Sequence, residues 1–133
     1  MRFMIQVRAT VTTELGARPP AHFAKLVEEM GAFHEEMARA GVLLDGAGLR
    51  PLRSGWRQHY RTDGRIEHVD GPYAEAKELI AGYTLIQVKS REEALAWSRR
   101  FPNPMPGEDC CIEVRQLYEE ADFLPGGDMS PTP

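Results

Sequence analysis

The sequence is poor in cysteine, in long apolar runs and in positive charge, and each shortage excludes a class of protein. Its two cysteines, Cys110 and Cys111, are adjacent, so they form neither a usual disulfide nor a CxxC redox motif. The longest apolar runs are only a few residues, whereas a membrane-spanning helix needs about 20. A formal net charge of -4 argues against nucleic-acid binding, which requires clustered positive charge.

The rest of the composition is that of one globular domain. Hydrophobic residues make up 42% and charged residues 27% of the 133 residues, which is enough to bury a core without disulfides. The N-terminus becomes polar too early for a signal peptide, so we expect a cytoplasmic protein. No P-loop, GxGxxG or HExxH motif occurs, and no cofactor or metal is predicted. We place the domain at residues 1–120 and predict a flexible tail at 121–133.

Hydrophobic periodicity predicts the first strand and a long helix. Residues 2–8 alternate apolar and polar side chains, as a half-buried strand does. The helix should run from the prolines at 19–20 to about Ala40, where Gly41 provides the usual stop. Its apolar stripe consists of Phe23, Leu26, Val27, Met30, Phe33 and Met37.

Turn and cap signals predict the remaining elements. Asp63-Gly64 indicates a hairpin turn, and Ser90 followed by Glu93 indicates the start of a second helix. The expected elements are a short strand within residues 42–52, hairpin strands at 56–61 and 65–70, a strand at 79–88, a helix at 90–101 and a strand at 110–117. This order predicts a ferredoxin-like α+β sandwich, with two helices on one face of a mostly antiparallel sheet and an inserted β-hairpin.

One face of this sheet should carry no helix. If Ile5, Ile86 and Val114 pack under the helices, the alternate positions of the same strands face the other way. Those positions hold Met4, Gln6, Leu85, Gln87, Glu113 and Arg115. Because such a mixed face is hard to leave in water, we expect it to pair with a second copy, giving a homodimer with a lined cavity.

Four segments of the chain, in order, resemble the motifs of a known family. Residues 40–49 (AGVLLDGAGL) are similar to an AGVLLDGEGL segment, and residues 70–78 (DGPYAEAKE) to a DGPFAETKE signature. Residues 82–86 (GYTLI) resemble a GGYYLIE strand, and residues 113–115 a closing EVR. These are motifs of the YCII-related superfamily, and specifically of its DGPF branch. The resemblance extends from the N-terminus to about Leu117.

The resemblance implies a fold, an activity class and a partner. It implies a ferredoxin-like dimer and an acid–base enzyme that uses a histidine and an aspartate, with no general substrate. It also implies a link to sigma-70-type transcription factors. The aspartate corresponds to Asp70 and the histidine most closely to His34. Tyr73 replaces the usual phenylalanine and adds a hydroxyl, while Ala76 replaces the usual threonine and removes one.

Asp70 and His34 each have a structural and a catalytic interpretation. Asp70 precedes Gly-Pro, where its carboxylate can cap the following backbone or act as a general acid or base in a desolvated pocket. His34 lies beside the apolar stripe of the first helix. A histidine there is either a hydrogen-bonded core residue or the catalytic partner that the resemblance implies.

The hairpin offers a second polar cluster. With a two-residue Asp-Gly loop, His59 lies opposite His68. The same register puts Arg57 opposite Asp70, so all four side chains share one face. This face could bind a small anion or form a two-histidine, one-carboxylate metal site. The alternative, which we favour over metal, is a solvated face with a weak ion pair.

Three further residues are candidates for substrate binding. Arg115 and Gln6 face the predicted cavity, where the guanidinium could hold a carboxylate or instead form an intersubunit salt bridge with Glu113. The Tyr73 hydroxyl is the third candidate.

These observations predict a small acid–base enzyme with isomerase- or lyase-like proton transfer. Asp70 would act with His34 or with the pair His59 and His68. The substrate would be a small anionic metabolite in a cavity made by sheet and hairpin. The alternative is a non-catalytic ligand-sensing or protein-binding module that works with a sigma-70-type factor.

Overall fold

The computed structural model describes residues 1–16, 19–70 and 75–127 and confirms the predicted α+β architecture. Its elements are β1 (Arg2–Arg8), α1 (Val11–Leu15), α2 (Pro20–Arg39), β2 (Leu43–Gly48), β3 (Trp56–Tyr60), β4 (Ile66–Asp70), β5 (Ile80–Gln87), α3 (Arg91–Arg99) and β6 (Ile112–Gln116), with 3-10 turns at Leu52–Ser54, Ala76–Glu78 and Glu120–Phe123. The sequence pattern does not predict α1, because five residues are too few for a helical repeat. A capping box between Thr10 and Thr13 holds its start.

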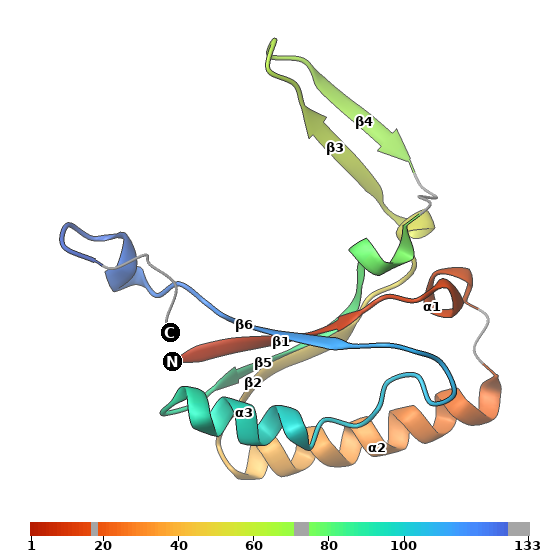
Figure 1. Ribbon diagram of the computed structural model, residues 1–133, viewed down its shortest axis with the longest axis vertical. Helices are drawn as coiled ribbons and strands as arrows, with labels where there is room; N and C mark the ends of the chain where they lie inside the picture. Colours follow the sequence, from red (N-terminus) through yellow and green to blue (C-terminus); the bar gives the residue numbers. More distant parts are fainter. Residues whose placement is uncertain (17–18, 71–74, 128–133) are drawn as a thin grey trace.

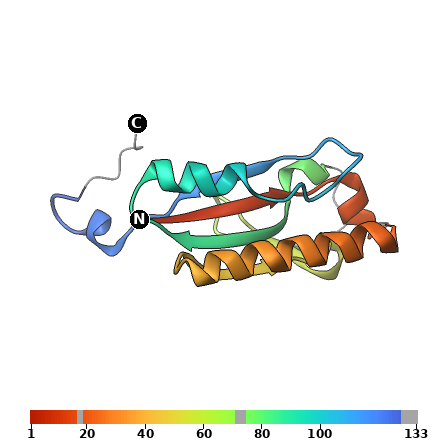
Figure 2. The ribbon, with the colours of Figure 1, turned by 90° about the horizontal axis from the view of Figure 1, so that it is seen from below.

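The main sheet has the strand order β2-β5-β1-β6, and every neighbouring pair is antiparallel. Helix α2 connects β1 to β2 across β5, and α3 connects β5 to β6 across β1. These two crossovers form the split β-α-β pattern of a ferredoxin-like fold. Both helices cover the same face of the sheet, as the sequence predicts (Figures 1 and 2).

The core lies between the sheet and the C-terminal half of α2. Ile5, Met37 and Ile86 are fully buried, and the ring of Phe33 packs edge-on against two aromatic rings from α3 and the loop after it. Only the C-terminal part of the predicted apolar stripe of α2 packs in the core. Phe23, near the N-terminus of the helix, is 53% exposed, so that half of α2 is not packed closely against the sheet.

The faces of the sheet are those predicted. Ile5 pairs with Val114 on the helix side, although Val114 is 36% exposed because it lies on the edge strand β6. Met4 pairs with Leu85 on the face without helices, where the Tyr83 hydroxyl also donates to Asp45. The hairpin of β3 and β4 forms a separate two-stranded sheet that extends away from this open face (Figure 1).

The predicted register of the hairpin is wrong by one residue. Trp56 pairs with Asp70 and Gln58 with His68. The Arg61 N–H donates to the Arg65 carbonyl, so the loop holds three residues instead of two. Its last residue is a glycine in the left-handed region, at φ 90°, which makes a type I turn with a bulge.

This shift separates the four polar side chains that the sequence places together. His68 and Asp70 lie on one face with Trp56, whereas Arg57 and His59 lie on the other. The face shared by two histidines, an arginine and a carboxylate does not form. The hypothesis of a two-histidine, one-carboxylate metal site loses its geometric basis. In the three described ranges, no three His, Cys, Asp or Glu side chains gather as metal ligands.

Candidate functional site

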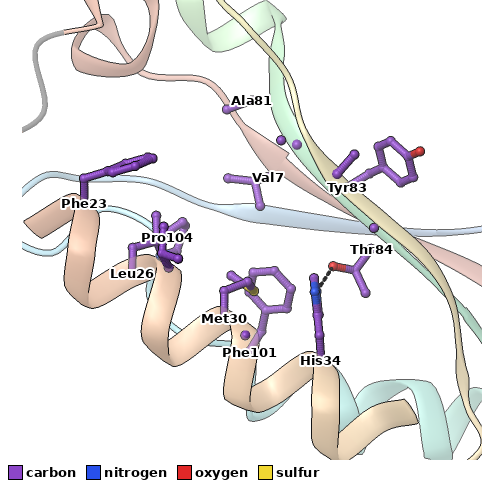
Figure 3. A pocket seen from close by; sticks show the side chains of 16 residues that line it. Val7, Phe23, Leu26, Met30, His34, Ala81, Tyr83, Thr84, Phe101 and Pro104 are labelled. Carbon is purple, nitrogen blue, oxygen red and sulfur yellow. Dashed lines mark hydrogen bonds between the residues drawn. The ribbon is translucent and has the colours of Figure 1, made fainter.

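His34 is a titratable side chain that the fold places in an apolar cavity. It projects from α2 toward the sheet, where its Nε2 lies 2.8 Å from Oγ1 of Thr84 on β5 (Figure 3). Thr84 is 2% exposed. The threonine hydroxyl can donate or accept, so either neutral tautomer of the imidazole is satisfied by this bond.

The cavity lies between strands β1, β2 and β5 and the part of α2 from Phe23 to His34, and its volume is about 380 Å³. Most of its wall is apolar, including Val7, Phe23, Leu26, Met30, Phe101 and Pro104. It exists because α2 is not packed closely here. Its size and its few polar groups are typical of a site for a small molecule.

Two features keep His34 neutral and in place. Burial lowers the pKa of its imidazole below the ordinary value of 6.5, because an apolar wall disfavours the charged form. Gly46 on β2 makes room for the ring, since a Cβ there would lie 3.0 Å from His34 Cε1. A neutral imidazole in an apolar cavity can accept a proton at physiological pH.

The lowered pKa of His34 predicts a pH dependence of stability. In the unfolded chain the histidine has its ordinary pKa near 6.5, and in the folded protein a lower one, so between the two values the unfolded state binds more protons. The free energy of unfolding should therefore decrease as the pH falls below about 6.5 and through the folded-state pKa. Chemical denaturation from neutral to acidic pH should show a smaller decrease for His34→Gln than for the wild type, because the other titrating groups are common to both. Equal decreases would contradict the shift.

Asp70 does not pair with His34, but with His68. Its Oδ1 lies 2.8 Å from His68 Nε2, and the two side chains are 76% and 56% exposed. The indole of Trp56 stacks on the His68 ring with a centroid distance of 5.9 Å. The pair lies on the hairpin, which extends from the open side of the sheet, whereas α2, which carries His34, covers the other side (Figure 1).

The remaining predicted site residues that the structure describes lie apart from the His34 cavity. Arg57 and His59 are on the second face of the hairpin. Arg115 and Gln6 are on the open face of the sheet, where the Gln6 amide lies 3.6 Å from Met4 Sδ. Tyr73 lies outside the described residues.

Comparison with known proteins identifies the family. A family model of the YCII-related domain matches residues 1–121. The chain belongs to the YCII-related family. This YCII-related protein is also 31% identical over 102 residues to an uncharacterized protein of Rhizobium meliloti (strain 1021), a match that covers 77% of this chain and 78% of that protein. None of the described helices is both long and apolar enough to cross a membrane.

Two residues next to His34, Thr84 and Gly46, are missing from the sequence-based site. Both lie in segments that the motifs mark, residues 82–86 and 40–49, yet neither residue type suggests chemistry alone. Thr84 bonds to a histidine 50 positions earlier, and such a contact depends on how α2 lies against β5. Their position inside these two motifs is the only feature of the sequence that could have pointed to them.

Proposed function

We propose that this YCII-related protein is a small-molecule acid–base enzyme, with isomerase- or lyase-like proton transfer at His34. The observation that carries the proposal is the neutral imidazole, bonded to Thr84 inside an apolar cavity. Such an imidazole can take a proton from an activated C–H bond of a bound substrate and return it to another atom of the same molecule. This proton transfer needs no nucleophilic side chain.

Asp70 with His68 is the second acid–base pair in the proposal. The two groups are within hydrogen-bonding distance, but they are exposed in the single chain, so desolvation favours His34 as the reacting group. His59 lies on the opposite face of the hairpin and is the weaker candidate. The sigma-factor alternative receives no specific support from a contact among the described residues.

The test is hydrogen–deuterium exchange into a panel of small carbonyl compounds, charged and uncharged, followed by mass spectrometry in D2O. An acid–base enzyme labels the acidic C–H position of any compound that it binds productively. We expect the rate to rise with pH as His34 loses its proton, with a midpoint below 6.5. A non-catalytic ligand-sensing module would bind members of the panel without labelling them, and that result would overturn the proposal.

We also propose that the open face of the sheet pairs with the same face of a second copy. Met4, Gln6 and Leu85 form its centre and are already half-buried in one chain. Such a face is self-complementary about a two-fold axis. Light scattering should give twice the 15.0 kDa of one chain, and Leu85→Arg should shift the mass toward that of a monomer. A monomeric mass for the wild type at micromolar concentration contradicts this arrangement.

A further inference from the structure

A second cavity adjoins the one that holds His34. Its volume is about 490 Å³, and Phe23, Gly48 and Ala81 line both cavities. Beyond them the second cavity continues to Leu49 and to Thr13 on α1. Phe23 and His34 lie at opposite ends of the inner cavity along α2 (Figure 3), and eleven residues of helix span about 16 Å. The outer cavity therefore continues the inner one past Phe23, away from His34.

The described residues that line the two cavities offer no charged partner to a ligand, because none of them is Lys, Arg, Asp or Glu. Arg53 lies next to Gly16 at the outer rim, but it donates to the Glu14 carbonyl at 2.9 Å, and the Glu14 carboxylate accepts from a backbone N–H. Both signs of charge occur at that rim. A buried anion would therefore lose its hydration without gaining a countercharge.

We propose that the two cavities form one channel for an elongated, uncharged molecule. Its polar, reacting end lies at His34 and Thr84, and its apolar chain runs past Phe23 into the outer cavity. This inference rests on the proposed function for the reacting end and adds the class of substrate. It replaces the small anionic metabolite that the sequence predicts.

The test is calorimetric binding of methyl ketones of increasing chain length at about pH 8, with carboxylates of matched length as the charged arm. Each methylene that leaves water for the channel should tighten binding about fourfold. The gain should continue until the outer cavity is filled and then stop. Carboxylates of the same length should bind at least about tenfold more weakly, because their charge has no partner in the wall.

Two matched variants locate the outer end of the chain. Leu49 and Leu44 are each 46% exposed, but of the two only Leu49 is among the described residues that line the inner and outer cavities. Leu49→Asp should remove the gain for long ketones and leave short ones unchanged. Leu44→Asp should leave the whole series as in the wild type. Circular dichroism checks that both variants are folded.

The outcomes separate this inference from the proposed function. Affinity that still increases with ketone chain length in His34→Gln, together with no deuterium exchange in the wild type or the variant, supports the channel. The same result overturns the proposed enzyme. Exchange that depends on His34, with affinities that do not increase with chain length, overturns the channel and leaves the enzyme. Carboxylates that bind as tightly as ketones would also overturn the channel, because tight binding of a buried carboxylate requires a positive group in the wall.

Discussion

Replacing His34 by glutamine is expected to reduce deuterium exchange into a bound carbonyl compound by about 10²- to 10⁴-fold, the usual contribution of a positioned acid–base group. Glutamine has a similar reach and can still bond to the Thr84 hydroxyl, which lies 2.8 Å from the imidazole in the wild type. It cannot take up a proton. Binding of the compound should change little, because the wall of the cavity is mostly apolar. The loss should appear in the catalysed rate and leave the dissociation constant nearly unchanged.

Two control variants show which group transfers the proton. Thr84→Val removes the hydroxyl but keeps the shape of the side chain, so it should lower the rate less than His34→Gln and alter its pH profile. Asp70→Asn removes the carboxylate that contacts His68 on the exposed hairpin and should leave the rate close to that of the wild type. If Asp70→Asn abolishes exchange and His34→Gln does not, the reacting pair is on the hairpin.

The architecture could be predicted from sequence because its signals are local. The alternation in β1 and the apolar spacing in α2 each reflect which side chains face one buried surface. The end of α2 is marked in the same way, since Gly41 adopts φ 76° and its N–H donates to the Ala38 carbonyl. These features need no knowledge of distant parts of the chain.

The prediction of the hairpin register is wrong because the turn signal in the sequence is ambiguous. An Asp-Gly pair is common in two-residue loops, and glycine also ends three-residue loops with a bulge. Gly64 takes the second role here, with the Arg61 carbonyl as its partner. One residue of shift is enough to exchange the faces of a strand. As a result, His59 and His68 point in opposite directions.

The cavity could not be predicted, because it is a place where packing is incomplete. Phe23 and Met37 belong to the same apolar stripe, yet one is 53% exposed and the other fully buried. The difference depends on how closely each part of α2 approaches the sheet. His34 lies between the packed and the open part of the helix. The sequence therefore cannot show that its imidazole contacts Thr84 beside a cavity.

Replacing Ile86 by alanine is expected to lower the free energy of unfolding by about 2–5 kcal/mol. Ile86 is 0% exposed, near the C-terminal end of β5, and packs in one cluster with Phe3 and Met37. The deleted carbons leave a void that the sheet and α2 cannot close fully, because β5 is paired on both sides. Urea denaturation followed by circular dichroism measures the change.

The same substitution on the hairpin provides the control. Ile66 is 61% exposed in the single chain, so Ile66→Ala should change the free energy of unfolding by no more than about 0.5 kcal/mol. A loss at Ile66 as large as that at Ile86 would mean that the hairpin face with Trp56 and His68 is buried against another chain. A small loss at Ile86 would instead contradict the packed core between the sheet and α2, and with it the frame that holds His34 at its cavity.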